Sequence, residues 1–382
     1  MPVSDQQNDM EQSKIKPRIA ILGAGLMGRM LAVSLKNDYA VELFDQDKGQ
    51  GQQSAAYLAA AMLAPLAESA DATQAVMQLG ELALKRWPAF LQTLSTPVFF
   101  QQTGSLIVAF EQDLGDLKQF KSRLKGKDFE EVADARVREL EPDLNERLKQ
   151  GLYLPNEGQL DNRELLNALG QELLNSDVIW HYDAFITPSE KGFLHNGQAM
   201  DEFDTVFDCR GFGAKVDQAN GQANLSSSRP PLRGVRGEVV RIKAPDVKLN
   251  RPVRLMHPRY PIYISPKENG VFVVGATQLE SEDIREPTVR SALELLSACF
   301  SVSSGFAEAE ILGIYSGIRP AYLDNEPKIT LQGNVITVNG LFRHGFMLAP
   351  VMLEQCLNVL NGTHKTSEIT QIMPDLVQEL EL

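Results

Sequence analysis

The chain contains few cysteines and no long apolar run. Its 382 residues include three cysteines, Cys209, Cys299 and Cys356, which lie far apart with no Cys-x-x-Cys spacing. This argues against a disulfide framework or structural zinc and favours a reducing compartment. No stretch reaches the roughly 18 to 20 apolar residues of a membrane-spanning helix. We therefore expect a cytoplasmic protein with no membrane span and no metal site.

Positive charge is also scarce. The chain has 37 Lys and Arg against 50 Asp and Glu, a net charge of −13. Nucleic-acid binding requires a basic face, so no nucleic-acid partner is expected. An anionic small substrate is not excluded, because a few buried arginines can form a local positive pocket. Residues 1–16 are polar and lack the apolar centre of a signal peptide, so we interpret them as a flexible leader.

Common catalytic and nucleotide motifs are missing as well. The sequence has no Gly-x-Ser-x-Gly, no His-Glu-x-x-His and no Walker loop. The chain is longer than most domains with a single hydrophobic core, which suggests two domains.

What the sequence does contain, near its start, is a strand, a glycine-rich turn, a helix and a second strand. Arg18–Leu22 is an apolar run of strand length, and the turn Gly23-Ala24-Gly25-Leu26-Met27-Gly28 opens a segment of helical spacing. A second strand, Ala40–Phe44, ends at Asp45. This order is typical of the βαβ unit that binds dinucleotides.

Each part of this motif has a physical role. Gly23 permits the tight turn, Gly25 lets the backbone approach a pyrophosphate, and Gly28 lets the helix pack close to the strand. The phosphates are expected at the helix N-terminus, at Leu26 and Met27. Asp45, 20 residues after Gly25, is placed to bind the ribose hydroxyls. The motif alone does not separate NAD from FAD.

The rest of the chain predicts an α/β fold with a discontinuous nucleotide domain. Asp161 is expected to cap an amphipathic helix that runs to Leu174, and residues 71–94 and much of 111–147 look helical. Further strands are expected at 205–207, 237–242, 261–264, 271–274 and 334–338, with a helix at 346–360. We predict a Rossmann-type domain from residues 17–95, 155–225 and 310–382. Residues 96–154 and 226–309 form an α+β substrate domain with an antiparallel sheet.

Several segments, taken in order, resemble the glycine oxidase branch (thiamine-pathway type) of the D-amino-acid oxidase family. They are Gly23–Gly28, Ala59–Pro65, Tyr263–Pro266, Val274–Thr277, Gly317–Ala321 and Phe342–Gly345. The resemblance covers about residues 17–362. It implies bound FAD and oxidation of glycine or another small amino acid or amine to the imine. O₂ is the implied electron acceptor, giving H₂O₂, and the product would supply thiazole synthesis for thiamine.

The resemblance also implies roles for single residues at the substrate. Arg319 would bind the substrate carboxylate, since a planar guanidinium matches a carboxylate bidentately. Tyr263 would flank the substrate, with Tyr260 as a nearby competitor. Arg319 could instead be a surface ion-pair residue, and Tyr263 a half-buried sheet tyrosine. His257, which precedes a proline, is interpreted as structural.

Other residues are implied to contact the flavin. Ala60, Ala61 and Met62 match the segment that runs along the isoalloxazine, where relatives often have glycine at position 61; an Ala-rich packed helix would look the same. The loop before the last predicted helix would border the ring, where positive charge stabilises the reduced flavin; a simple helix cap is the alternative. This loop comprises Arg343, His344, Gly345, Phe346 and Met347. More weakly, Phe185 matches an adenine contact, and Gln46 and Ser54 match the ribose and pyrophosphate region.

Several alternatives stay open at this stage. A D-amino-acid or sarcosine dehydrogenase would keep the flavin but change the substrate or the electron acceptor. A flavin module acting on modified tRNA is weakened by the acidic charge. A non-catalytic flavin-binding partner protein and an NAD(P)-dependent dehydrogenase are further alternatives. The sequence leaves the oligomeric state open, including a homo-oligomer.

Overall fold

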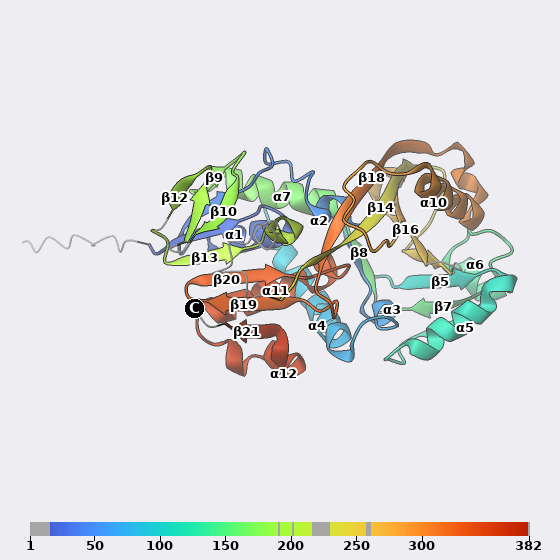
Figure 1. Cartoon of the computed structure of the whole chain (residues 1–382). Coiled ribbons are helices and arrows are strands. Elements are labelled where there is room, and N and C mark those ends of the chain that lie inside the picture. The colour runs from blue at the N-terminus through green and yellow to red at the C-terminus, as the bar shows by residue number, and fades with distance from the viewer. Residues whose placement is uncertain (1–15, 190–191, 201, 216–229, 257–260, 381–382) are drawn as a thin grey trace, which may run out of the picture.

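The structure is a computed structural model that describes residues 16–189, 192–200, 202–215, 230–256 and 261–380. Two large sheets dominate the molecule, one near each end of its long axis (Figure 1). Tyr260, His257 and nearly all of the expected leader lie outside the described residues.

The first large sheet is mainly parallel and has the doubly wound order. Its strands run, in spatial order, β21 (Val377–Glu379), β19 (Lys328–Gln332), β20 (Val335–Asn339), β13 (Thr205–Asp208), β1 (Arg18–Leu22), β2 (Ala40–Phe44) and β9 (Ile179–His181). β1 lies between β13 and β2 and is parallel to both. The chain therefore winds outward from β1 in both directions, and such a switch point is where open α/β sheets bind ligands.

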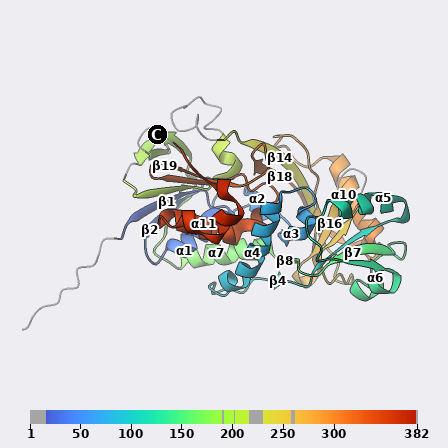
Figure 2. The same cartoon turned by 90° about the horizontal axis from the view of Figure 1, so that it is seen from below.

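Alternating side chains give this sheet two covered faces. Ile19 and Ile21 of β1 point into a core made with helices, and Ala20 and Leu22 point into a second core on the opposite face. The helical face carries α1 (Leu26–Leu35), α4 (Gln74–Leu91), α7 (Asn162–Leu174) and α11 (Gly345–Leu360). Figure 2 shows α11 and α4, which pack against each other, together with α1 and α7. The opposite face carries the small sheet β10 (Ile186–Ser189), β11 (Gly192–His195) and β12 (Gln198–Met200).

The second large sheet is mainly antiparallel. Its order is β18 (Glu310–Ala321), β14 (Arg233–Lys243), β17 (Val271–Gly275), β16 (Ile262–Pro266), β15 (Val253–Leu255), β5 (Ser105–Ala109), β7 (Gln150–Leu154) and β6 (Glu130–Ala133). One core of this sheet includes residues of α6 (Asp134–Leu140) and α10 (Val289–Val302). Another includes residues of α5 (Leu114–Arg123) and α3 (Pro65–Glu68).

Short elements join the two large sheets. β3 (Met62–Leu63), β8 (Gly158–Leu160) and β4 (Phe100–Gln101) form a three-stranded sheet of their own. The one-turn helix α2 (Ala55–Leu58) contacts both α7, which covers the first large sheet, and β18, which belongs to the second large sheet. A last short helix, α12 (Glu368–Ile372), packs against α4.

The predicted fold class is confirmed, and β1 and β2 have the predicted bounds. The N-cap of α7 is also as predicted, because the Asp161 carboxylate accepts hydrogen bonds from the backbone N–H groups of Arg163 and Glu164 at 2.8 and 3.0 Å. The stretch 111–147 is only partly helical, since β6 lies between α5 and α6. No helix in the described part of the chain is long and apolar enough to cross a membrane.

The position of β18 differs from the expected domain boundary at residue 310. β18 pairs with β14 from Glu310 to Ala321 and so belongs to the antiparallel sheet. The prediction grouped residues 310–321 with the strand and helix that follow them in the sequence. The long antiparallel pairing with β14 instead makes these residues part of the second large sheet. We propose that the nucleotide domain resumes after Ala321, and that the two domains otherwise follow the predicted segments.

Candidate active site

The glycine-rich turn after β1 has the geometry that its three glycines predict. Gly23 has φ +92°, and a Cβ at Gly28 would lie 1.8 Å from the carbonyl oxygen of Gly23. Any side chain at these two positions would therefore collide with backbone. Gly25, the N-cap of α1, is different, because a Cβ there would meet nothing closer than Ser54 Cβ at 3.8 Å. The space in front of the N-terminus of α1 is thus open to a ligand.

Asp45 follows β2 directly and lies beside this turn. Its Oδ2 accepts a hydrogen bond from the N–H of Ala24 at 2.9 Å, and its Oδ1 accepts one from the N–H of Asp47 at 3.2 Å. Burial raises the pKa of the Asp45 carboxyl above its usual value. The carboxylate thus fixes the turn while lying at the end of the strand where the ribose is expected.

The weaker sequence matches lie further out. Gln46 is exposed, and its Nε2 donates to Gln53 Oε1 at 3.4 Å. The Ser54 hydroxyl donates to the Gly51 carbonyl at 2.6 Å and caps α2. Phe185 is 67% exposed, so its ring is open to a planar partner. The contacts of these three residues with the adenine, ribose and pyrophosphate of the cofactor therefore remain predictions.

The segment Ala60–Met62, which leads into β3, has an unusual backbone. Ala61 has φ +50°, a left-handed conformation that favours glycine. The buried Lys267 ammonium holds this segment by donating to the carbonyls of Ala60 and Leu160 at 2.8 and 2.7 Å. Burial lowers the pKa of Lys267 to about 7. Sequence analysis missed this lysine, because its acceptors are backbone atoms more than 100 positions away.

Arg319 lies on β18, opposite Val235 of the neighbouring strand β14. Its guanidinium occupies the space over Gly237 of β14, where a Cβ would lie 2.3 Å from Arg319 Nη2. Nη1 donates to the Thr277 carbonyl at 3.3 Å. Among the residues that the structure describes, no carboxylate pairs with Arg319. Burial lowers the pKa of Arg319, yet an arginine stays charged in proteins, so a cation without a counterion stands at this point.

Tyr263 and Met62 belong to the same small apolar cluster near Arg319. Their side chains pack around the buried residues Ala60, Val239 and Val273. Gly275 leaves room for the phenol, since a Cβ there would be 2.9 Å from the Tyr263 oxygen. Burial raises the pKa of Tyr263, and the charge of Arg319 partly opposes that rise. The structure therefore brings the two residues predicted at the substrate, Arg319 and Tyr263, next to Met62, and the charge of Arg343 also acts on both.

Arg343 is engaged by a carboxylate that the sequence did not reveal. Arg343 Nε lies 2.7 Å from Glu68 Oε2, and its Nη2 donates to Glu68 Oε1 at 3.0 Å. Arg254 Nη2 donates to the same Oε1 at 2.7 Å, and His344 Nε2 lies 3.3 Å from Oε2. Burial opposes the charge of Glu68, but Arg343 and Arg254 outweigh it and hold its pKa well below the usual range.

In the last part of the predicted flavin loop, Gly345 has open space beside its backbone, whereas the side chains of Phe346 and Met347 are buried. A Cβ at Gly345 would meet no other atom within 4 Å, so the start of α11 is open. The side chains of Phe346 and Met347 are 5% and 2% exposed and belong to the helical core. Any contact of these two residues with a flavin would therefore use their backbone.

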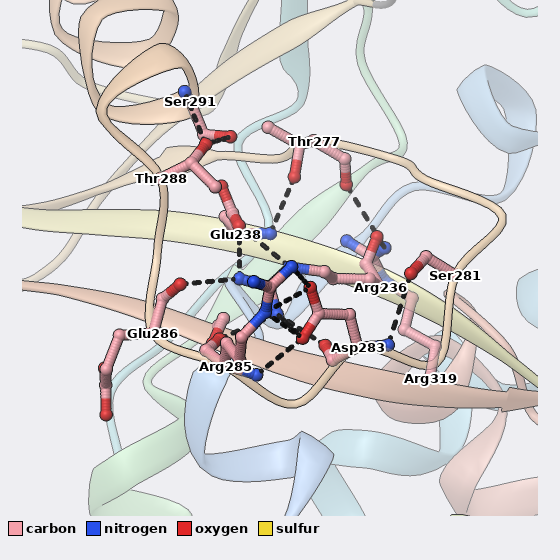
Figure 3. A network of polar contacts seen from close by, with 11 residues as sticks. Arg236, Glu238, Thr277, Ser281, Asp283, Arg285, Glu286, Thr288, Ser291 and Arg319 are labelled. Atoms are coloured by element: carbon pink, nitrogen blue, oxygen red, sulfur yellow. Dashed lines mark hydrogen bonds and ion pairs between the residues drawn. The ribbon is translucent and has the colours of Figure 1, made fainter.

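A second polar network fixes the far side of β14, opposite Arg319. Figure 3 shows the Arg236 guanidinium enclosed by Glu238 and the segment 283–286. Nε and Nη2 donate to Glu238 Oε1 at 2.9 and 2.6 Å. Nη1 donates to the Arg285 carbonyl at 2.7 Å, and Nη2 also donates to the Glu286 carbonyl at 3.0 Å. This segment continues from Thr277 and Gln278, whose oxygens accept from Arg319 and Arg343. Arg236 therefore anchors the segment that lies against both arginines.

Comparison with known proteins agrees with this geometry. A family model described as FAD dependent oxidoreductase (DAO) matches residues 18–353. The chain belongs to this family. A Rhizobium etli protein, named provisionally as the thiamine biosynthesis oxidoreductase ThiO, is 37% identical over 88% of this chain and 94% of its own length.

Glycine oxidases are further relatives. The Geobacillus kaustophilus glycine oxidase is 25% identical over 87% of this chain and 90% of its own length. A crystal structure of glycine oxidase from the same organism superposes with a TM-score of 0.79, covering 94% of this chain and 98% of that one.

The cofactor of the family is FAD, and the described residues fit it. The turn Gly23–Gly28 offers the N-terminus of α1 with open space at Gly25, as a pyrophosphate requires. Small residues at 60 and 61 allow close approach of a planar ring. The comparisons do not favour a non-catalytic flavin-binding partner protein or an NAD(P)-dependent dehydrogenase.

The contrast between Gly25 and Gly28 gives a direct test. Gly25 has φ −73° and free space around its Cβ direction, so Gly25→Val should fold but fill the pyrophosphate approach. The purified variant should lack the flavin band at about 450 nm while its thermal unfolding stays close to that of the wild type. Gly28→Val should lose both the flavin and the fold. Stoichiometric flavin in Gly25→Val would contradict this placement.

The anchoring by Arg236 gives a second test. Arg236→Lys keeps a cation beside Glu238 but cannot reach all the carbonyls of the segment, so each lost charged hydrogen bond costs about 1.5 to 3 kcal/mol. We expect normal flavin content, a lower melting temperature and a several-fold higher KM with a smaller change in kcat. Arg285→Lys, in the same segment but 86% exposed along its side chain, is the matched control. An unchanged KM in Arg236→Lys would show that the segment does not position Arg319.

Proposed function

We propose that the protein oxidises glycine, or another amino acid with little or no side chain, to the corresponding imine. The observation that carries this proposal is the partly buried Arg319, which has no carboxylate partner among the described residues and lies beside Tyr263 and Met62. A substrate carboxylate is the counterion that this arrangement lacks. The names of the relatives from Rhizobium etli and Geobacillus kaustophilus support the same reaction class.

Arg319 has the clearest role in the proposed mechanism. Its planar guanidinium binds the carboxylate bidentately and thereby fixes the position of the α-carbon one bond away. The Thr277 carbonyl and the space over Gly237 hold the guanidinium in place. Tyr263 and Met62 then form the wall next to the α-carbon and exclude water from it.

Arg343 has a different role, because Glu68 already neutralises part of its charge. When bound, the flavin supplies the redox chemistry by taking a hydride from the substrate α-carbon. The cation of Arg343 and the N-terminus of α11 provide positive potential at this end of the site. Glu68 fixes Arg343 in one orientation, and it also keeps Arg343 and Arg254 from competing with Arg319 for the substrate carboxylate.

We further propose O₂ as the final electron acceptor, with H₂O₂ as the product. The glycine oxidase relatives support an oxidase rather than a dehydrogenase. The name of the Rhizobium etli relative supports a role of the imine product in forming the thiazole of thiamine. The three cysteines are free, in keeping with a reducing compartment such as the cytoplasm.

The carboxylate role of Arg319 predicts a specific kinetic defect. Removing one partner of a buried charge pair costs roughly 2 to 5 kcal/mol, so Arg319→Ala should lose about 30- to 5,000-fold in kcat/KM. Arg319→Lys should recover only part of the activity, because the fork geometry is lost. Flavin content, read from the visible spectrum, should not change in either variant. Near-normal kinetics of Arg319→Ala would place the carboxylate site elsewhere.

The wall formed by Tyr263 and Met62 predicts the order of substrates. Glycine and sarcosine should be preferred over D-alanine, and bulky D-amino acids and L-amino acids should be poor substrates. The preference should be graded, since an apolar pocket discriminates only about 1 to 3 kcal/mol per methylene.

Anaerobic bleaching of the flavin across this panel, followed by detection of H₂O₂ in air, measures both the substrate and the acceptor. If a larger amine bleaches the flavin while glycine and sarcosine do not, the glycine oxidase proposal is wrong. If air fails to restore the oxidised spectrum after bleaching, the protein is a dehydrogenase.

A further inference from the structure

A cavity of about 410 Å³ is lined by none of the residues assigned above to the flavin or the substrate. It is bounded by α7, by the loop 48–52 and by β9. Its wall includes three cationic and three aromatic side chains, namely Arg29, Lys48, Arg163, Tyr57, Trp180 and Tyr182. Among the described residues that line it, none is Asp or Glu, although the whole chain carries a net charge of −13.

Arg163 supplies a positive charge that forms no ion pair with any of the described residues. Its guanidinium lies between two rings, with Cζ 4.1 Å from the centroid of Tyr57 and 5.0 Å from that of Tyr315. Nε and Nη2 are buried and have no hydrogen-bond partner among the described residues, and Arg163 is one of the residues that line the cavity. The nearby Arg241 adds a like charge, which Asp161 offsets from 3.6 Å.

Trp180 adds an aromatic surface to the wall of the cavity. Its ring stacks on that of Tyr182 with centroids 5.2 Å apart and an interplanar angle of 29°. Its indole Nε1 is buried and, within the described residues, has no acceptor. Trp180 also lies over Arg29, with the Arg29 Cζ 4.9 Å from the ring centroid. An aromatic pair in the same cavity wall as the cations of Lys48 and Arg163 suits a planar ligand that carries negative charge.

The floor of the cavity is rigidly built. Arg29 is 2% exposed and donates to the carbonyls of Ala24, Leu166 and Gly49 at 2.8 to 2.9 Å. Gly49 has φ +86°, and a Cβ there would lie 2.6 Å from the ring of Tyr182. Asp45 and Asp47 act on the charge of Arg29, whereas neither Lys48 nor Arg163 forms an ion pair with a described residue. Two cations thus remain for a ligand.

We propose that this cavity binds a planar aromatic anion, no larger than a mononucleotide, at a site separate from the flavin and the amine substrate. The ring stacks on Trp180 and Tyr182, and the anionic group contacts Arg163 and Lys48. A volume of this size lies within the usual range of roughly 300 to 1,000 Å³ for small-molecule sites. This inference does not depend on the proposed amine oxidation.

Calorimetric titration of the flavin-loaded protein with 1-naphthyl phosphate tests the site. The compound carries a two-ring system and a phosphate, and we expect one saturable site per chain with Kd of about 1 mM or tighter. Inorganic phosphate and 1-naphthol each lack one of the two features and should bind at least about tenfold more weakly. No saturable binding of 1-naphthyl phosphate would overturn the proposal.

Variants locate the binding. Arg163→Gln and the surface change Lys48→Gln should each weaken it by about ten- to a hundredfold, as expected for a lost charged hydrogen bond. Arg147→Gln removes the same charge from an exposed arginine that stacks on Phe110 in the other domain, and it should have no effect. Arg319→Ala should also leave Kd unchanged, which separates this cavity from the substrate site. Loss of binding in Arg319→Ala, or wild-type affinity in both Arg163→Gln and Lys48→Gln, would overturn the assignment.

Discussion

The carboxylate of Glu68 joins three segments that lie far apart in the sequence. It belongs to α3, and it meets Arg254 of β15 and Arg343 before α11, at separations of 186 and 275 positions. A buried carboxylate is costly unless it is paired, and here two guanidinium groups and His344 surround it. Removing Glu68 would leave two cations facing each other at the junction of the two domains. The relative position of these segments therefore depends on this one charge.

The same carboxylate decides which arginine is free for a substrate. Arg254 and Arg343 are both satisfied by Glu68, while Arg319 contacts only carbonyl oxygens in the described part of the chain. Strand alternation then separates two functions on β14. Gly237 makes room for Arg319 on one face, and its neighbours Arg236 and Glu238 anchor the segment 277–286 on the other (Figure 3).

Local patterns in the sequence predicted the elements whose contacts are local. β1, the turn at Gly23, β2 and the N-cap at Asp161 are all set by spacing within a few residues. The positions of Arg319, Tyr263 and Met62 were reached through resemblance, and their proximity in the structure agrees with it. Glu68, Lys267 and Arg236 could not be predicted, because an isolated Glu, Lys or Arg carries no signal until the chain brings its partner close. The sheet to which β18 belongs could not be predicted for the same reason, since only the pairing with β14 decides it.

Arg29 links the flavin-binding turn to the second cavity. Its Nε donates to the carbonyl of Ala24 within the glycine-rich turn, and its Nη2 donates to the carbonyl of Gly49 in the cavity floor. The carboxylate of Asp45 holds Ala24 from the other side through the backbone N–H. The loop between Asp45 and Ser54 therefore has one side toward the expected ribose and pyrophosphate. Its other side, which includes Lys48, faces the second cavity, where Tyr182 also lies. Because Arg29 is buried and makes all three of its hydrogen bonds to backbone carbonyls, a ligand that moved this loop would also act on the turn at the N-terminus of α1.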